Sequence, residues 1–207
     1  MEKQLRKIVD KYKPAFSKGG KFGFLHSTFD AFETFLFVPN TVTRRGSHIR
    51  DANDLKRTMI IVIIALLPAL LFGMYNVGYQ HFAAIADPVS QAMWFKCWWY
   101  GFVRMLPMIL VSYIVGLGIE FAVAQHKGEE VNEGFLVTGL LIPMIMPIDI
   151  PLWILALAVA FSVVFGKEVF GGTGMNVFNP ALLARAFVFF AYTPKISGEQ
   201  VWIRGFS

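Results

Sequence analysis

The fold of this chain is decided by residues 167–192, which read KEVFGGTGMNVFNPALLARAFVFFAY. A glycine-rich turn at 171–174 interrupts one apolar run, and Pro180 opens the next. Asn176 and Asn179 lie between the two runs, three residues apart. Irregular polar backbone is tolerated at membrane depth only where it is buried in protein or lines a cavity. If the flanking segments lie in a membrane, this stretch is either part of a binding site or an extended helix cap.

The composition indicates that these segments do lie in a membrane. The chain has 207 residues, of which 56% are hydrophobic and 16% are charged, whereas about a quarter of a soluble domain is charged. Residues 58–86 contain no Asp, Glu, Lys or Arg, and a run of about 20 apolar residues is enough to cross a bilayer. The sequence therefore predicts an integral membrane protein.

The charge distribution predicts the orientation. Of the 19 Lys and Arg residues, 12 lie at or before Arg57. Such clustering is typical of cytoplasmic segments and places the N-terminus in the cytoplasm. The net charge of +5 does not predict nucleic-acid binding, because no aromatic stacking module is interleaved with the basic residues. Cys97 is the single cysteine, which excludes a disulfide framework within one chain.

The chain divides into a basic cytoplasmic arm, 1–57, and a transmembrane region, 58–207. Five apolar segments follow the arm, and the third and fifth are unusually short; they are 58–79, 102–125, 131–147, 151–170 and 180–192. The predicted fold class is therefore an all-α integral membrane protein with two short or half helices. Glu120 lies near the cytoplasmic end of the second span, where its carboxylate can reach the membrane interface, so it carries little weight as a site.

Short segments interrupted by Gly and Pro are the best sequence indication of a site inside a membrane protein. Asn179 suits an N-cap and Pro180 the first helical position, so the positive end of that half helix would face a polar ligand. The amides of Asn176 and Asn179 offer donors and acceptors that match the edge of a flavin ring or a quinone head group. A plain helix cap in a cytoplasmic loop explains the same residues, and both interpretations stay open.

Acidic residues form the second candidate site. Glu133 precedes Gly134 at the start of the third segment, where it fits an ion or quinone site at the cytoplasmic mouth. A carboxylate that only stabilises the helix N-terminus explains it equally simply. Asp30 lies on a short helix of the basic arm, and its spacing favours a solvated acidic face. No hydrolytic triad and no Cys/His metal spacing is present.

Several stretches together resemble the NqrB family, a membrane component of the sodium-translocating NADH:quinone oxidoreductases. They are GGK at 19–21, VPNTVTRRGSHIRDANDLKRTMI at 38–60, PALLFGMYN at 68–76, EEVNEGFLVTGLLIP at 129–143 and FGKEVFGGTGMNVFNPALLARAFVFFAY at 165–192. The resemblance runs in order from about residue 10 to residue 203. It implies one component of a six-protein complex of the bacterial inner membrane, with NqrA, NqrC, NqrD, NqrE and NqrF as partners.

The resemblance also implies cofactors and roles. Electrons would pass from NADH through bound flavins to ubiquinone while Na+ is pumped outward. Riboflavin would lie at Asn176 and Asn179, beside the glycine turn with Gly172 and Gly174. Glu133 and Gly134 would lie near the quinone. Asp30 and Glu133 would belong to the Na+ pathway.

The family fold has ten spans in two related halves, of which this chain resembles the first. The family's FMN is attached covalently to a threonine in a Ser-Gly-Ala-Thr stretch. Here Gly205-Phe206-Ser207 resembles the approach to that stretch, so the FMN threonine is expected beyond Ser207 and the chain is expected to be a fragment. Two alternatives are RnfD of the Rnf electron-transport complex, which shares the Asn-x-x-Asn-Pro-Ala motif, and a non-redox channel or transporter with internal repeats.

Overall fold

The computed structural model describes three continuous stretches, 55–127, 134–172 and 174–197, and four single residues, Val9, Lys13, Gly46 and Ile203. Within these stretches the regular elements are helices, and no strand is present. Three of the described helices are long and apolar enough to cross a membrane, and two shorter apolar helices accompany them. The prediction of an all-α membrane protein with short helices is therefore confirmed. Most of the predicted basic arm, with Asp30, lies outside the described residues.

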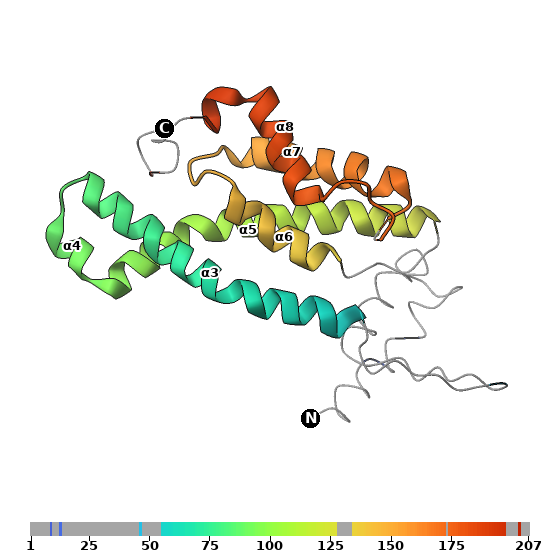
Figure 1. Cartoon of the computed structure of the whole chain (residues 1–207), viewed down its shortest axis with the longest axis horizontal. Coiled ribbons are helices and arrows are strands. Elements are labelled where there is room, and N and C mark those ends of the chain that lie inside the picture. Colours follow the sequence, from blue (N-terminus) through green and yellow to red (C-terminus); the bar gives the residue numbers. More distant parts are fainter. Residues whose placement is uncertain are drawn as a thin grey trace.

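Two long helices form a hairpin whose tip is a short helix (Figure 1). The hairpin consists of α3 (Leu55–Ala84), α4 (Pro88–Ala92) and α5 (Trp94–Lys127). Both long helices exceed the predicted spans. Helix α5 begins at Trp94 rather than near Phe102, because the aromatic run that precedes Phe102 is itself helical. A row of large apolar side chains on α3 is exposed, as expected of a lipid-facing surface; it includes Ile60, Ile61, Ile64, Leu67, Leu71 and Phe72.

The turn between the long helices is fixed by a cap. Asp87 is the N-cap of α4, and its Oδ1 accepts a hydrogen bond from the Ser90 amide at 3.0 Å. Bonds from Ser90 hold the pKa of Asp87 below its usual range. Pro88 follows at the first helical position, which suits a residue without an amide hydrogen. The chain therefore reverses sharply at this end, called the α4 end below.

Helices α3 and α5 cross with their backbones in contact. A Cβ atom on Gly101 would lie 1.8 Å from the Met74 carbonyl oxygen, and one on Gly78 would lie 2.0 Å from the Cys97 carbonyl oxygen. Small residues allow such approaches between membrane helices, where van der Waals packing replaces the hydrophobic effect as the main source of association. The two glycines therefore set where and at what angle α3 leaves α5.

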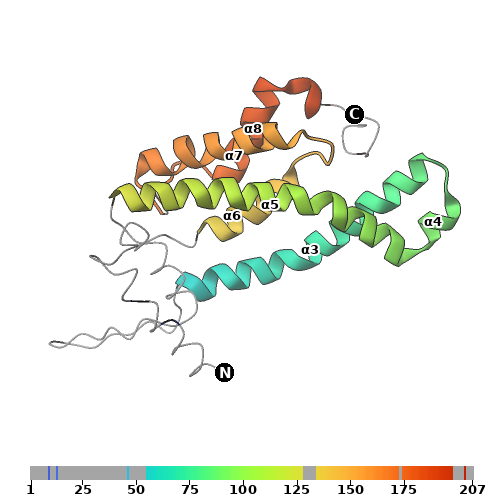
Figure 2. The same ribbon diagram turned by 180° about the vertical axis from the view of Figure 1, so that it is seen from behind.

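Three further helices, two of them short, pack along the other half of α5. They are α6 (Phe135–Ile145), α7 (Leu152–Gly166) and α8 (Pro180–Ala191). At 1.5 Å per residue, the 11 residues of α6 and the 12 of α8 extend about 16 and 18 Å, well short of the ~30 Å hydrocarbon core. Seen from behind, the α3–α5 hairpin projects past these helices at the α4 end (Figure 2). The opposite end, where α5 and α7 finish and α6 and α8 begin, is called the polar end.

Two apolar clusters hold these helices together. The larger joins α5 to α6, α7 and α8, and its fully buried members include Phe135, Ile142, Leu155 and Val159. The smaller joins α3, α5 and α6 around Met74. The ring of Phe135 packs directly against Gly116 of α5. A Cβ atom on Gly116 would lie only 1.8 Å from the Cζ atom of that ring. The first turn of α6 is thus seated in a notch of α5, which fixes the position of Gly134 at the polar end.

Candidate functional site

The glycine-rich turn at the polar end is a left-handed loop. Helix α7 ends at Gly166, a 3-10 turn follows at Glu168–Phe170, and Gly171, Gly172 and Gly174 then have φ values of 111°, 94° and 92°. L-residues with side chains rarely adopt such values. A Cβ on Gly172 or Gly174 would meet no atom within 4 Å, so the backbone conformation, and not crowding, is what requires glycine at these two positions.

Asn179 caps α8 as predicted. Its Oδ1 accepts hydrogen bonds from the amides of Ala181 at 2.9 Å and Leu182 at 3.4 Å. Pro180 occupies the first helical position. These bonds satisfy two of the four amides that a helix N-terminus leaves unpaired. The cap uses the oxygen of Asn179 and leaves the amide nitrogen without a hydrogen-bond partner among the described residues.

Asn176 holds the loop that leads to this cap. Its Oδ1 accepts from the Gly174 amide at 3.3 Å, and its Nδ2 donates to the Phe178 carbonyl at 3.1 Å. Because Nδ2 carries two hydrogens, one donor is left over. Both asparagines therefore shape the loop with their oxygens and keep an N–H donor for another group.

A pocket of about 510 Å³ lies between this loop and α6. Its wall combines apolar side chains with the polar loop. The lining residues are Met59, Gly134, Val137, Thr138, Leu141, Lys167, Gly174, Asn176, Val177, Phe178, Asn179 and Pro180. The structure thus brings Gly134, Gly174, Asn176 and Asn179 together from two separate stretches of sequence. Gly172 does not line this pocket, and Glu133 and Asp30 lie outside the described residues.

The pocket is positively polarised by the helices that surround it. Gly134 is the N-cap of α6 and makes no side-chain cap bond, and Pro180 is the first residue of α8. Both residues line the pocket. Since a helix N-terminus carries roughly half a positive charge, two such ends beside Lys167 favour a ligand with a negatively polarised edge.

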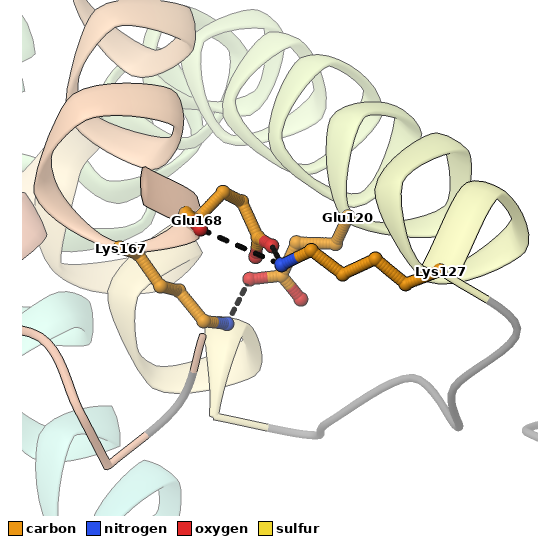
Figure 3. A network of polar contacts seen from close by, with 4 residues as sticks. All are labelled: Glu120, Lys127, Lys167 and Glu168. Atoms are coloured by element: carbon orange, nitrogen blue, oxygen red, sulfur yellow. Dashed lines mark hydrogen bonds and ion pairs between the residues drawn. The ribbon is translucent and has the colours of Figure 1, made fainter. Parts of the chain in front are cut away.

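Two ion pairs join α5 to the end of α7 (Figure 3). Lys167 Nζ donates to Glu120 Oε1, and the two side chains are only 6% and 3% exposed. Lys127 Nζ lies 3.5 Å from Glu168 Oε2 and is 34% exposed. The Glu120–Lys167 pair is buried and adjoins the pocket through Lys167, whereas the second pair lies toward solvent and does not line it.

Sequence reasoning gave this buried pair little weight. The carboxylate of Glu120 does not face solvent or lipid, because it lies inside the bundle against Lys167. The predicted span 151–170 matches a candidate membrane span at Leu152–Phe170; within it α7 ends at Gly166, and Lys167 follows as a buried C-cap residue. A signal was available, since a charge inside a membrane protein needs a partner and the predicted topology put both residues at the same end.

The site has the properties of a small-molecule pocket. Its volume falls within the range of about 300 to 1,000 Å³ that holds cofactors, and a mostly apolar wall with a few convergent polar groups is the usual pattern. Among the described residues, no group of three or more His, Cys, Asp or Glu side chains is placed to hold a metal ion. The geometry suits a flat ring whose polar edge faces the asparagines, the helix N-termini and Lys167.

Comparisons with known proteins relate most of the chain to one family. The profile of the NQR2, RnfD, RnfE family matches residues 42–206. The NqrB protein of the Na(+)-translocating NADH-quinone reductase of Pseudomonas aeruginosa is 43% identical over 96% of this chain and 54% of its own length. The corresponding proteins of Chromohalobacter salexigens and Azotobacter vinelandii are 43% and 42% identical over 96% of this chain, and over 53% and 54% of their own lengths. The chain thus spans about half the length of these relatives.

Proposed function

Because this chain belongs to the NQR2, RnfD, RnfE family, we propose that it is a membrane component of a respiratory complex that couples electron transfer from NADH to ubiquinone with outward Na+ transport. Its relatives support this proposal, because each is named as the NqrB component of a Na(+)-translocating NADH-quinone reductase. The partners would be NqrA, NqrC, NqrD, NqrE and NqrF of the same complex. The names of these relatives also favour this assignment over RnfD of an Rnf complex.

The proposed setting is the bacterial inner membrane, with the N-terminus in the cytoplasm. The 12 basic residues at or before Arg57 support this orientation, because basic residues near membrane spans stay on the cytoplasmic side. Lys127, Lys167 and Arg57 lie at the ends of segments that would meet on that side. The polar end, with its pocket, would therefore open toward the cytoplasm.

The pocket is proposed to hold a flavin, with riboflavin as the form that the family resemblance implies. The single observation that carries this proposal is the convergence of Gly174, Asn176 and Asn179 with Gly134 around one cavity. The two spare N–H donors can bond ring oxygens and nitrogens, while apolar side chains of α3 and α6 cover the ring faces. Gly172 would act indirectly, by allowing the turn that presents these groups. The flavin would supply the electron-carrying chemistry.

Quinone and Na+ are assigned to the neighbouring region. Gly134 and Glu133 are proposed to lie near the quinone head group, and the position of Gly134 on the pocket wall supports electron transfer over a short distance. Asp30 and Glu133 are proposed to belong to the Na+ uptake pathway. Both carboxylates would be on the cytoplasmic side of the proposed topology, where Na+ enters.

Replacing Asn179 by serine separates the two roles of this residue. Serine is also a good N-cap, so α8 should keep its first turn and the thermal stability of the complex should change little. The amide N–H donor disappears, and the serine hydroxyl lies closer to the backbone than the Asn179 amide nitrogen, so riboflavin affinity should fall about tenfold, the equivalent of one hydrogen bond to a polar ring. Asn179→Ala should lose both functions and cost about 1 kcal/mol of stability in addition.

The measurement is the amount of non-covalent flavin retained by the purified complex during dilution, followed by fluorescence after denaturation. Asn76→Ser, at an exposed position on α3 away from the pocket, is the matched control and should retain wild-type flavin. Full flavin retention in Asn179→Ser would reduce Asn179 to a cap and overturn its role in binding. A wild-type complex without flavin at this site would overturn the proposed function itself.

A further inference from the structure

Lys167 connects the pocket to the buried carboxylate of Glu120. It is the first residue after α7, lines the pocket, and is only 5% exposed. Its Nζ donates to Glu120 Oε1 on α5. Glu120 lies outside the stretches that suggested flavin binding, and Lys167 precedes the glycine turn and the two asparagines, so their contact is a separate observation about the same cavity.

Neither member of this pair is fully satisfied within the described residues. An ammonium carries three N–H donors, and the bond to Glu120 uses one of them. Glu120 Oε2 is buried and has no hydrogen-bond partner there. Burying unpaired polar groups costs about 1 to 3 kcal/mol each, and more for charged groups. A ligand oxygen at the pocket wall would use a remaining donor of Lys167 and recover part of that cost.

The charges around the pocket favour a negatively charged ligand. Glu120 balances Lys167, and the C-terminus of α7 at Lys167 offsets one helix N-terminus. The N-termini of α6 and α8 together still leave the wall positively polarised, because no described carboxylate lines it. Interactions between charges are stronger in a protein interior than in water. A ring that gains negative charge on reduction would therefore be bound more tightly in its reduced form than in its oxidised form.

We propose that Lys167 binds the polar edge of the flavin and stabilises its reduced, negatively charged form, and that Glu120 holds the Lys167 ammonium in position. This inference rests on the proposed function. A bound flavin would supply the redox chemistry, in which uptake of two electrons and one proton from a reductant would leave one negative charge beside Lys167. A charge near the ring nitrogens is one of the means by which a protein tunes a flavin.

The test is a redox titration, with dithionite as reductant, of the non-covalent flavin in the purified complex. Lys167→Met removes the positive charge but leaves Glu120 unpaired, so the double variant Glu120→Gln/Lys167→Met, in which both groups are neutral, is measured beside it. Each is expected to lower the preference for reduced over oxidised flavin by about tenfold, which lowers a two-electron midpoint potential by about 30 mV. Lys167→Arg, which keeps the charge, should shift the potential much less.

Lys127→Met is the matched control, because it removes the other lysine of the same cluster, which does not line the pocket. Its midpoint potential should equal that of the wild type. An unchanged potential in the double variant, with flavin still bound, would overturn the role of Lys167 and leave the flavin site standing. Equal shifts of the midpoint potential in the double variant and in Lys127→Met would mean that any nearby positive charge has the same effect at long range. That result would also overturn the specific role of Lys167. Absence of flavin from the wild-type protein would instead refute the proposed function.

Discussion

Lys167→Met is expected to destabilise the bundle by about 3 to 5 kcal/mol, because it leaves the Glu120 carboxylate buried without its counter-charge. Glu120 is 3% exposed and lies on α5, against which α7 packs. Glu120→Gln should be destabilising for the same reason, since it strands the Lys167 ammonium. Thermal or SDS-induced unfolding of the purified protein in detergent measures both losses.

The double variant Glu120→Gln/Lys167→Met should recover most of this stability. Replacing both members of a buried pair by neutral groups of similar size is often neutral or even stabilising, whereas breaking one member is costly. The combined loss should therefore be far smaller than the sum of the single losses. Additive losses would mean that the two residues act independently, and the buried pair would then have no energetic role.

Lys127→Met provides the scale for an exposed pair. Lys127 is 34% exposed and its Nζ lies 3.5 Å from Glu168 Oε2, and pairs of this kind contribute about 0 to 1 kcal/mol. A small loss is expected, which salt should reduce further. The two pairs have the same residue types on the same two segments, and they differ in solvent access and in closeness of contact.

The double variant also separates folding from ligand binding. If its stability returns while the preference for reduced flavin stays low, Lys167 acts on the ligand directly. If the stability and the preference for reduced flavin both return to wild-type values, the pair affects flavin binding only by stabilising the fold. A buried ion pair is weak grounds for stability, so its presence beside a pocket calls for a functional reason. The flavin provides one, because a compensated ammonium can face a ring that changes charge.

Local sequence features predicted the parts of the fold that depend on neighbouring residues. The cap at Asn179 and the helix start at Pro180 are properties of a few adjacent residues, and the structure has them as expected. The glycine-rich turn was also predicted, and the structure adds that three of its glycines are left-handed. Helix type and shortness followed from apolar runs broken by Gly and Pro. Helix ends were less certain, as α5 shows, because the aromatic residues from Trp94 onward can belong to a helix or to an interfacial loop.

Local sequence features did not predict the contacts between segments that are distant in the sequence. Glu120 and Lys167 are separated by 47 positions, and no local pattern says that one faces the other. Met59 reaches the pocket from α3, which depends on how α3 crosses α5. The part of α6 that lines the pocket does so only because Phe135 fits the notch at Gly116. The pocket therefore follows from packing between helices, which periodicity within one helix does not specify.

Gly101→Val is expected to abolish the native crossing of α3 and α5. A Cβ at this position would lie 1.8 Å from the Met74 carbonyl oxygen and 2.6 Å from its carbonyl carbon. Backbone atoms cannot move aside as the end of a flexible side chain can, so the helices must separate or rotate. Because close packing is the main source of attraction between membrane helices, a fall in thermal stability of several kcal/mol is expected.

The effect should reach the pocket although Gly101 is far from it. Met59 lies 15 residues before Met74, about 22 Å along the helix axis, so a rotation of about 10° at this contact would move Met59 by about 4 Å, most of the width of a side chain. Gly118→Val on the same helix is the matched control, because a Cβ there meets nothing within 4 Å and the substitution has the same helix propensity cost. Gly101→Val should lose both stability and retained flavin, and Gly118→Val should keep both. Full flavin retention in a destabilised Gly101→Val complex would show that α3 is not needed as a pocket wall, and the asparagine loop, α6 and Lys167 would then bind the ring without it.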